Sequence, residues 1–327
     1  MNSFRYVRAS DVSEALAAFA QEHSAKWLAG GTNLIDLMKE RIEQPETLID
    51  INALPLGGIE LHADRLEIGA TTRMSELAQD ERVRSEFPAI AQALEESASR
   101  QLRNMASIGG NLMQRTRCAY FRDHATPCNK RVPGEGCSAI GGWTRGHAIL
   151  GTSDACINVH PSDLAVALCA MDATVRIANA EGSRDVAVDE FYVLPAARPD
   201  VDTVLQPGDL IVSVSVPRRS WFTGSRYYKL RDRSSYEFAL VSAAVAADMR
   251  DGVPAEIAIA LGGVAPKPWR ARAAERVLRG HRPDSRLLAE AADAELAQAR
   301  SYGENAFKMP LVRNLIRRAV GEVTGCA

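Results

Sequence analysis

The sequence lacks the features that would place the protein in a membrane or on nucleic acid. No apolar run approaches the roughly 20 residues that a membrane-spanning helix requires. A net charge of −2 over 327 residues argues against a general nucleic-acid binder. The first residues, 1–5, lack the apolar core of a signal peptide. We therefore expect no membrane span and no nucleic-acid partner. The chain is expected in the cytoplasm or, if it is exported folded with a signal-bearing partner, in the periplasm.

Motifs for side-chain catalysis are also missing. The sequence contains neither a G-x-x-x-x-G-K-[ST] phosphate loop nor a G-x-S-x-G nucleophile elbow. Residues 134–139 match G-x-G-x-x-A, but no strand pattern precedes them, so this match predicts no dinucleotide site. His124, His147 and His160 are more typical of structural hydrogen bonding than of a general base. Any chemistry is therefore expected to belong to a cofactor.

Cysteine is scarce and unevenly placed. Four of the six cysteines follow the pattern C-x9-C-x8-C-x18-C: Cys118, Cys128, Cys137 and Cys156. The tight C-x2–4-C pairs of structural zinc sites are absent, and a chain of this length can build its core without disulfides. Seven basic residues stand against two acidic ones between positions 103 and 145, which suits an anionic iron–sulfur cluster. From spacing alone, both a cluster and a zinc site with inert cysteines stay open.

The other two cysteines differ from these four. Cys169 lies in an apolar run and is expected to be a small buried hydrophobe. Cys326 lies in the C-terminal tail, where disorder is the default expectation.

Two glycine-rich segments are present before the cysteines. A strand at 26–29 runs into Gly30-Gly31-Thr32-Asn33 and a helix at 34–42, and a strand follows at 47–51. The second segment is Ser107 to Asn111. Glycine lets backbone N–H groups approach an anion closely, so two such loops could converge on a diphosphate.

The remaining pattern predicts a mixed chain with a domain boundary near residue 220. We expect strands at 65–70, 173–178, 210–216 and 257–261. Helices are expected at 12–19, 74–79, 88–99, 163–171, 271–279, 285–300 and 308–324.

With these motifs in view, the sequence resembles the FAD-binding subunits of molybdenum hydroxylases, the xanthine dehydrogenase family. The first glycine segment resembles their first FAD loop, residues 107–112 resemble the second, and residues 162–164 resemble a third contact. The resemblance implies that FAD is bound by Lys26, Trp27, Leu28, Ala29, Gly30, Gly31, Thr32, Asn33, Leu34, Ser107, Gly110, Asn111, Thr116, Asp163 and Lys229. It implies no catalytic side chain.

The segments around the cysteines resemble the subset of this family that oxidises aldehydes and carries a [4Fe–4S] cluster. That resemblance implies that Cys118, Cys128, Cys137 and Cys156 are the cluster ligands. It also implies an α+β fold, in which a two-subdomain FAD-binding region of the vanillyl-alcohol-oxidase (PCMH) type precedes a C-terminal α/β domain of the CO dehydrogenase flavoprotein type. The expected domains are residues 1–220, with subdomains of about 1–55 and 56–220 and the cluster loop at 115–160, and residues 221–327.

The implied function is electron transfer within a heterotrimeric, molybdenum-dependent aldehyde oxidoreductase. The expected partners are a subunit with the molybdenum cofactor, where substrate is oxidised, and a subunit with two [2Fe–2S] clusters. Electrons would pass from these clusters through FAD to an external acceptor. Two alternatives stay open: the flavoprotein subunit of an aromatic hydroxyacyl-CoA reductase, and a non-catalytic interaction module stabilised by a metal.

Overall fold

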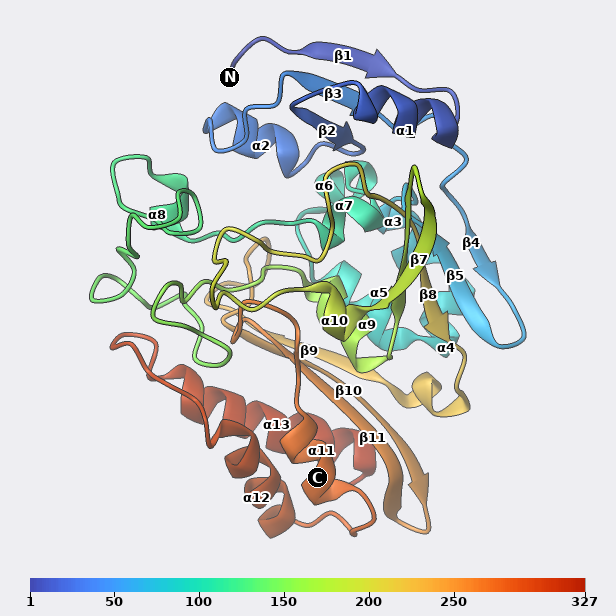
Figure 1. The fold of residues 1–327 in the computed structure, drawn as a ribbon. Coiled ribbons are helices and arrows are strands. Elements are labelled where there is room, and N and C mark those ends of the chain that lie inside the picture. Colours follow the sequence, from blue (N-terminus) through green and yellow to red (C-terminus); the bar gives the residue numbers. More distant parts are fainter. Residues whose placement is uncertain (327) are drawn as a thin grey trace.

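The computed structural model describes residues 1–326, in which three sheets follow one another from the N-terminal to the C-terminal end of the molecule (Figure 1). The N-terminal sheet is parallel, with the order β1 (Arg5–Arg8), β3 (Thr47–Asp50) and β2 (Ala25–Leu28). Helices α1 (Val12–Ala20) and α2 (Leu34–Lys39) connect its strands. Asp11 caps α1 by accepting a hydrogen bond from the Glu14 N–H, as its position predicts.

The middle sheet is antiparallel and forms the largest core. Its order is β4 (Ile59–Leu61), β5 (Arg65–Gly69), β8 (Leu210–Pro217), β6 (Thr174–Asn179) and β7 (Gly182–Ala187). The accompanying helices are α3 (Met74–Gln79), α4 (Glu81–Glu86), α5 (Pro88–Glu95), α6 (Arg100–Met105), α7 (Ile108–Leu112), α9 (Asp163–Ala170) and α10 (Val188–Phe191). Strands that are far apart in sequence, β5 and β8, pair directly, so the cysteine segment is an excursion from one continuous body.

The C-terminal sheet lies between α9 and three later helices. Its order is β12 (Trp269–Arg270), β11 (Val253–Gly262), β10 (Val241–Arg250) and β9 (Arg226–Leu230), preceded by the 3₁₀ turn η1 (Ser220–Gly224). Ala244 and Ala246 join the core of the middle sheet, whereas Ala243 and Val245 join the core beneath α11 (Arg272–Leu278), α12 (Ser285–Leu296) and α13 (Lys308–Thr324). These four residues are consecutive in β10, and successive side chains of a strand point to opposite faces of the sheet, so the two pairs enter different cores.

Helix α9 is buried along its whole length. All eight of its residues are buried, because α5 and the strands β10 and β11 of the C-terminal sheet pack against it. A helix that is apolar all round is typical of such a position. The first residue, Asp163, is the one charged residue of this helix, and it contacts Tyr227 and Lys229 of β9.

The cysteine segment contains little regular structure. Between α7 and α9 only α8 (Ala119–Arg122) is helical, and the segment projects from one side of the molecule (Figure 1). The predicted helices 88–99 and 285–300 are shorter, ending at Glu95 and Leu296. Cys326 is ordered, contrary to expectation: its N–H donates to the Gly321 carbonyl at 2.8 Å, and its side chain packs against the C-terminal core. Among the helices of residues 1–326, none has the length and hydropathy needed to cross a bilayer.

Candidate functional site

The first glycine segment has backbone donors available for a ligand. It follows β2 and leads into α2, with Gly31 in the left-handed region at φ 72°. Within the described residues 1–326, no N–H group from Gly30 to Asn33 donates to a protein acceptor. The Asn33 side chain accepts from the Arg115 N–H at 3.1 Å through Oδ1, yet its buried Nδ2 has no partner in the same part of the chain. Such donors at a helix N-terminus fit a phosphate group.

The first glycine segment closely approaches the residue that precedes the second. A Cβ atom at Gly30 would lie 1.9 Å from the Met105 carbonyl oxygen, so only glycine allows this approach. Met105 directly precedes the second segment, which begins at Ala106 and Ser107. The loops therefore lie side by side, as binding of one extended ligand requires.

The second segment differs from expectation, because it is helical and most of its backbone N–H groups already donate to acceptors within the protein. Residues 108–112 form α7, capped by the Ser107 side chain, which accepts from the Gly110 N–H at 3.2 Å. The N–H groups of Ile108 and Gly109 donate to the Thr72 and Ala70 carbonyls at 3.0 and 2.8 Å, and that of Asn111 donates to the Ser107 carbonyl. Backbone donors from 108 to 111 are therefore occupied, and the segment can offer a ligand only the Ser107 N–H and its polar side chains.

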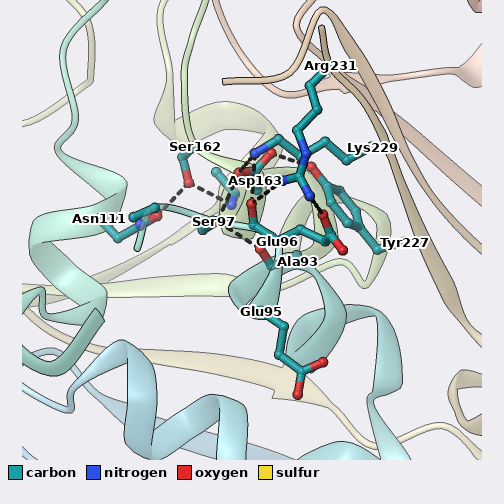
Figure 2. A network of polar contacts seen from close by, with 12 residues as sticks. Ala93, Glu95, Glu96, Ser97, Asn111, Ser162, Asp163, Tyr227, Lys229 and Arg231 are labelled. Atoms are coloured by element: carbon teal, nitrogen blue, oxygen red, sulfur yellow. Dashed lines mark hydrogen bonds and ion pairs between the residues drawn. The ribbon is translucent and has the colours of Figure 1, made fainter. Parts of the chain in front are cut away.

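Asp163 and Lys229 occupy the centre of a buried polar network (Figure 2). Asp163 accepts from the ammonium group of Lys229 at 2.8 Å, from Ser97 Oγ at 2.9 Å and from the Tyr227 hydroxyl at 2.5 Å. Lys229 also donates to the Glu96 carbonyl at 3.0 Å. Burial, together with the charge of Asp163, raises the pKa of Tyr227 well above 10, so its hydroxyl stays protonated. The structure thus brings these two predicted residues together and pairs them with each other.

A pocket of about 340 Å³ lies between the cysteine segment, the N-terminus of α9 and the C-terminal sheet. Its walls include Thr116, Ser162, Asp163 and Gly263. Ser162 also donates to Asn111 Oδ1 at 2.5 Å, which links this pocket to the second glycine segment. The pocket and the glycine segments therefore form a continuous set of candidate contacts.

Five further predicted contacts lie beside the glycines of the first segment, and most of them already contact other parts of the protein. Trp27 stacks on Phe19 and donates to the Asp209 carbonyl at 2.8 Å, so its indole belongs to the N-terminal core. Lys26 pairs with Glu43 at 3.3 Å. Leu28 and Leu34 are half-buried, and the Leu28 carbonyl accepts from the Ile51 N–H at 3.0 Å. For Ala29, the carbonyl accepts from Asn52 at 3.0 Å.

The four clustered cysteines line one cavity, whereas Cys169 and Cys326 do not. Cys128 and Cys137 face each other in an isolated antiparallel bridge, and Cys118 caps α8. Burial raises the pKa of the Cys118 thiol to about 11 and that of Cys156 to about 12. A reactive free thiolate is therefore disfavoured at neutral pH, whereas a bound metal centre deprotonates its thiol ligands.

The spacing of these side chains bears on which metal centre they fit. Within residues 1–326, no three His, Cys, Asp or Glu side chains lie close enough to share one metal ion. A structural zinc ion requires its ligands around a single centre, whereas the thiolates of an iron–sulfur cluster bind different irons. Four thiols that line one cavity are a donor set that could bind the four irons of such a cluster.

Most basic residues of this segment contact groups other than the cysteine cavity. Arg131 donates to the Tyr120 and Phe121 carbonyls at 2.9 and 3.0 Å, and Arg122 pairs with Asp36. Among the lysines and arginines, Lys130 is the one whose charge lowers the pKa of Cys156. Most of these charges are therefore paired with carboxylates of other segments, and Lys130 is the base that bears on the cysteine cavity.

A chain of ion pairs that the sequence did not predict anchors the segment. Asp202 accepts from Lys130 at 2.6 Å and from Arg115 at 2.9 Å, and Arg115 continues to Glu43 at 2.8 Å. Burial would raise the pKa of Asp202, but the charges of Lys130 and Arg115 outweigh it and lower that pKa. Glu43 also holds Lys26, so the chain of pairs connects the cysteine segment to the first glycine segment. No local motif marks Asp202, which lies in a proline-rich connection.

Comparisons with known proteins agree with this geometry. Residues 2–219 match the family described as FAD binding domain in molybdopterin dehydrogenase, and residues 226–323 match the CO dehydrogenase flavoprotein C-terminal domain. The aldehyde oxidoreductase FAD-binding subunit PaoB of Escherichia coli K12 is 45% identical over 98% of both chains. The glyceraldehyde dehydrogenase medium chain of Sulfolobus acidocaldarius is 27% identical over 98% of both chains.

A solved structure shares the whole fold. Carbon monoxide dehydrogenase from Hydrogenophaga pseudoflava superposes with a TM-score of 0.78 at 28% identity, over 100% of this chain and 99% of that one. The predicted fold class is thereby confirmed, and so is the prediction of an oxidoreductase subunit. The alternative of a non-catalytic interaction module does not hold. The chain belongs to the FAD-binding subunits of the molybdenum hydroxylase family.

Proposed function

We propose that this chain is the flavin and iron–sulfur electron-transfer subunit of a molybdenum-dependent aldehyde oxidoreductase. The relative that is 45% identical over nearly the whole length is named for that activity, which favours aldehyde oxidation over reduction of an aromatic hydroxyacyl-CoA. When bound, FAD and a [4Fe–4S] cluster would supply the electron-carrying chemistry, taking electrons from [2Fe–2S] clusters of a partner and passing them to an external acceptor. Substrate oxidation would occur on a third subunit that holds the molybdenum cofactor.

One observation carries the proposal: the pocket and the cysteine cavity share a wall. Thr116, Cys118 and His147 line both spaces. A flavin ring in the pocket and a cluster on the cysteines would therefore be neighbours. No side chain of this chain needs to act as an acid or base for such a function.

The residues that would hold the flavin follow from the contacts described above. The free N–H groups of Gly30 to Asn33 would bind its diphosphate, and Asn33 Nδ2 would find the partner that it lacks. Ser107, Gly110 and Asn111 would border the middle of the ligand, with Thr116, Asp163 and Lys229 toward the ring. Residues 1–220 would form the flavin-binding domain and residues 221–327 the domain that closes the pocket.

The cluster would be held by Cys118, Cys128, Cys137 and Cys156. Lys130, buried beside Cys156 and paired with Asp202, would offset part of its negative charge. Such a complex could function in the cytoplasm or, after export with a signal-bearing partner, in the periplasm.

The experiment measures FAD, iron and acid-labile sulfide in the purified chain. We expect about one FAD and ~4 iron and ~4 sulfide per chain. Cys156→Ser should lower the iron content, whereas Cys169→Ser, which alters a buried thiol outside the cavity, should not. Zinc in place of iron, or equal iron in both variants, would contradict the cluster assignment; a colourless chain would contradict the flavin assignment.

A further inference from the structure

His147 stands between the cysteine cavity and the adjacent pocket and contacts one of the four cysteines. Its Nε2 lies 3.2 Å from Cys118 Sγ, within hydrogen-bond distance for sulfur. The ring is almost fully buried, at 8% exposure, and its Nδ1 has no partner among the described residues. Among the histidines of residues 1–326, this is the one with a hydrogen bond to a cysteine sulfur.

The backbone around His147 is fixed by the C-terminal region. Its N–H donates to the Thr144 carbonyl at 2.8 Å. On either side of it, Lys308 donates to the Gly146 carbonyl at 3.2 Å and Asn305 donates to the Ala148 carbonyl at 3.0 Å. Asn305, just before α13, and Lys308, the first residue of α13, therefore fix the backbone on both sides of the histidine.

Thr144 strengthens this attachment. Its N–H donates to Glu304 at 3.0 Å, and its hydroxyl donates to the Tyr302 carbonyl at 3.0 Å. The Glu304 N–H donates back to the Thr144 hydroxyl at 3.1 Å. These contacts fix the backbone that carries His147, so less entropy is lost when its ring forms the contact with Cys118.

The chemistry of the two partners determines which atom donates. A cysteine bound to iron is a thiolate and can only accept a hydrogen bond. A neutral imidazole carries one proton, and its position follows the stronger available acceptor. With Nδ1 unpartnered and Nε2 facing the sulfur, the proton belongs on Nε2.

We infer that His147 is a positioning residue for the iron–sulfur centre, donating a hydrogen bond from Nε2 to the Cys118 thiolate and thereby raising the reduction potential of the cluster. The inference rests on the cluster assignment of the proposed function. One electron added to a cluster increases the negative charge on its sulfur ligands. A donor to sulfur therefore stabilises the reduced form more than the oxidised form.

The test compares His147→Leu, His147→Gln and His124→Leu in the full chain. Leu removes the donor, whereas Gln keeps an N–H group that can reach the sulfur. His124 lies in the same segment but is exposed, and its Nε2 contacts the Glu40 carbonyl at 3.1 Å and no sulfur, so it controls for the loss of a histidine without a sulfur contact. Each protein is titrated with dithionite at controlled potentials, and the reduced cluster is measured by electron paramagnetic resonance beside iron content.

We expect His147→Leu to keep its iron and to hold about threefold less reduced cluster relative to oxidised cluster at a fixed potential. At 59 mV per tenfold change for a one-electron couple, this is a shift of about 28 mV to more negative potential. His147→Gln should shift less, and His124→Leu should not shift.

Three results would overturn the inference. An unchanged potential in His147→Leu would show that the contact does not tune the cluster. Loss of iron in both His147 variants but not in His124→Leu would make the residue a ligand or a structural element. A wild-type chain without iron would overturn the cluster assignment and this inference with it, and that outcome is seen before any variant is made.

Discussion

The ammonium group of Lys229 lies 2.8 Å from Asp163 Oδ2, and the two side chains are 1% and 6% exposed. This ion pair joins strand β9 of the C-terminal sheet to the first residue of α9. Tyr227, two residues before Lys229 on the same face of β9, donates to the other carboxylate oxygen. The pair therefore connects the C-terminal sheet to α9 (Figure 2), and Asp163 also lines the pocket.

We predict that Lys229→Met lowers the free energy of unfolding by about 3 kcal/mol, because Asp163 would keep a buried charge without its cation. Flavin content should fall in the same variant. The double variant Asp163→Asn with Lys229→Met should recover part of the stability, since neither partner then remains charged. Chemical denaturation of the three proteins measures this, and additive losses would show that the pair is not coupled.

Gly30→Ala should separate the two glycine segments. The added Cβ meets the Met105 carbonyl oxygen at 1.9 Å, so the backbone must move, at a cost of about 1–3 kcal/mol. We expect reduced FAD occupancy after purification. Gly224→Ala is the control, because a Cβ there meets nothing within 4 Å. Equal occupancy in both variants would show that the contact between the segments is not needed for flavin binding.

Asp202→Asn should weaken the attachment of the cysteine segment. Lys130, whose side chain is 2% exposed, would lose its only carboxylate within the described residues, and we expect a loss of about 3 kcal/mol in unfolding free energy. Iron content should fall with it. Asp200→Asn removes a neighbouring acid whose partner, Arg198, is exposed, so a much smaller effect is expected. Equal losses in both variants would contradict the anchoring role.

The stability that depends on Lys308 should change with pH. Burial, and next the charge of Arg145, lowers the pKa of Lys308 to about 7 from its ordinary value of 10.5. Between these values the unfolded chain binds more protons than the folded chain, so rising pH stabilises the wild type by at most about 1.4 kcal/mol per pH unit. Lys308→Met cannot titrate at this position.

The unfolding free energy of the wild type minus that of Lys308→Met should therefore increase from pH 7 to pH 9. It should be nearly constant below pH 6, where the lysine is protonated in both states. Denaturant titrations over this range measure the difference, and a difference that does not vary with pH would refute the assignment.

Local sequence predicted the first glycine segment correctly but misjudged the second. Gly30 and Gly31 follow a strand and precede a helix. Gly31 has a positive φ in the turn, and Gly30 allows the close approach to the Met105 carbonyl. Gly109 and Gly110 suggested a loop because glycine is a poor helix former. They lie in α7 instead. A Cβ at Gly109 would lie 3.1 Å from the Ala70 Cβ, so the close packing of this helix against Ala70 favours glycine.

The sequence by itself determined the family, the fold class and which cysteines belong together, because these depend on motifs and spacing along the chain. Only the tertiary structure decided that Asp202 anchors the cysteine segment, that Lys229 pairs with Asp163 and that His147 faces Cys118. Each of these contacts joins residues between 29 and 72 positions apart. No hydrophobic period or capping rule specifies such pairs, since they arise where separate sheets and segments pack against each other.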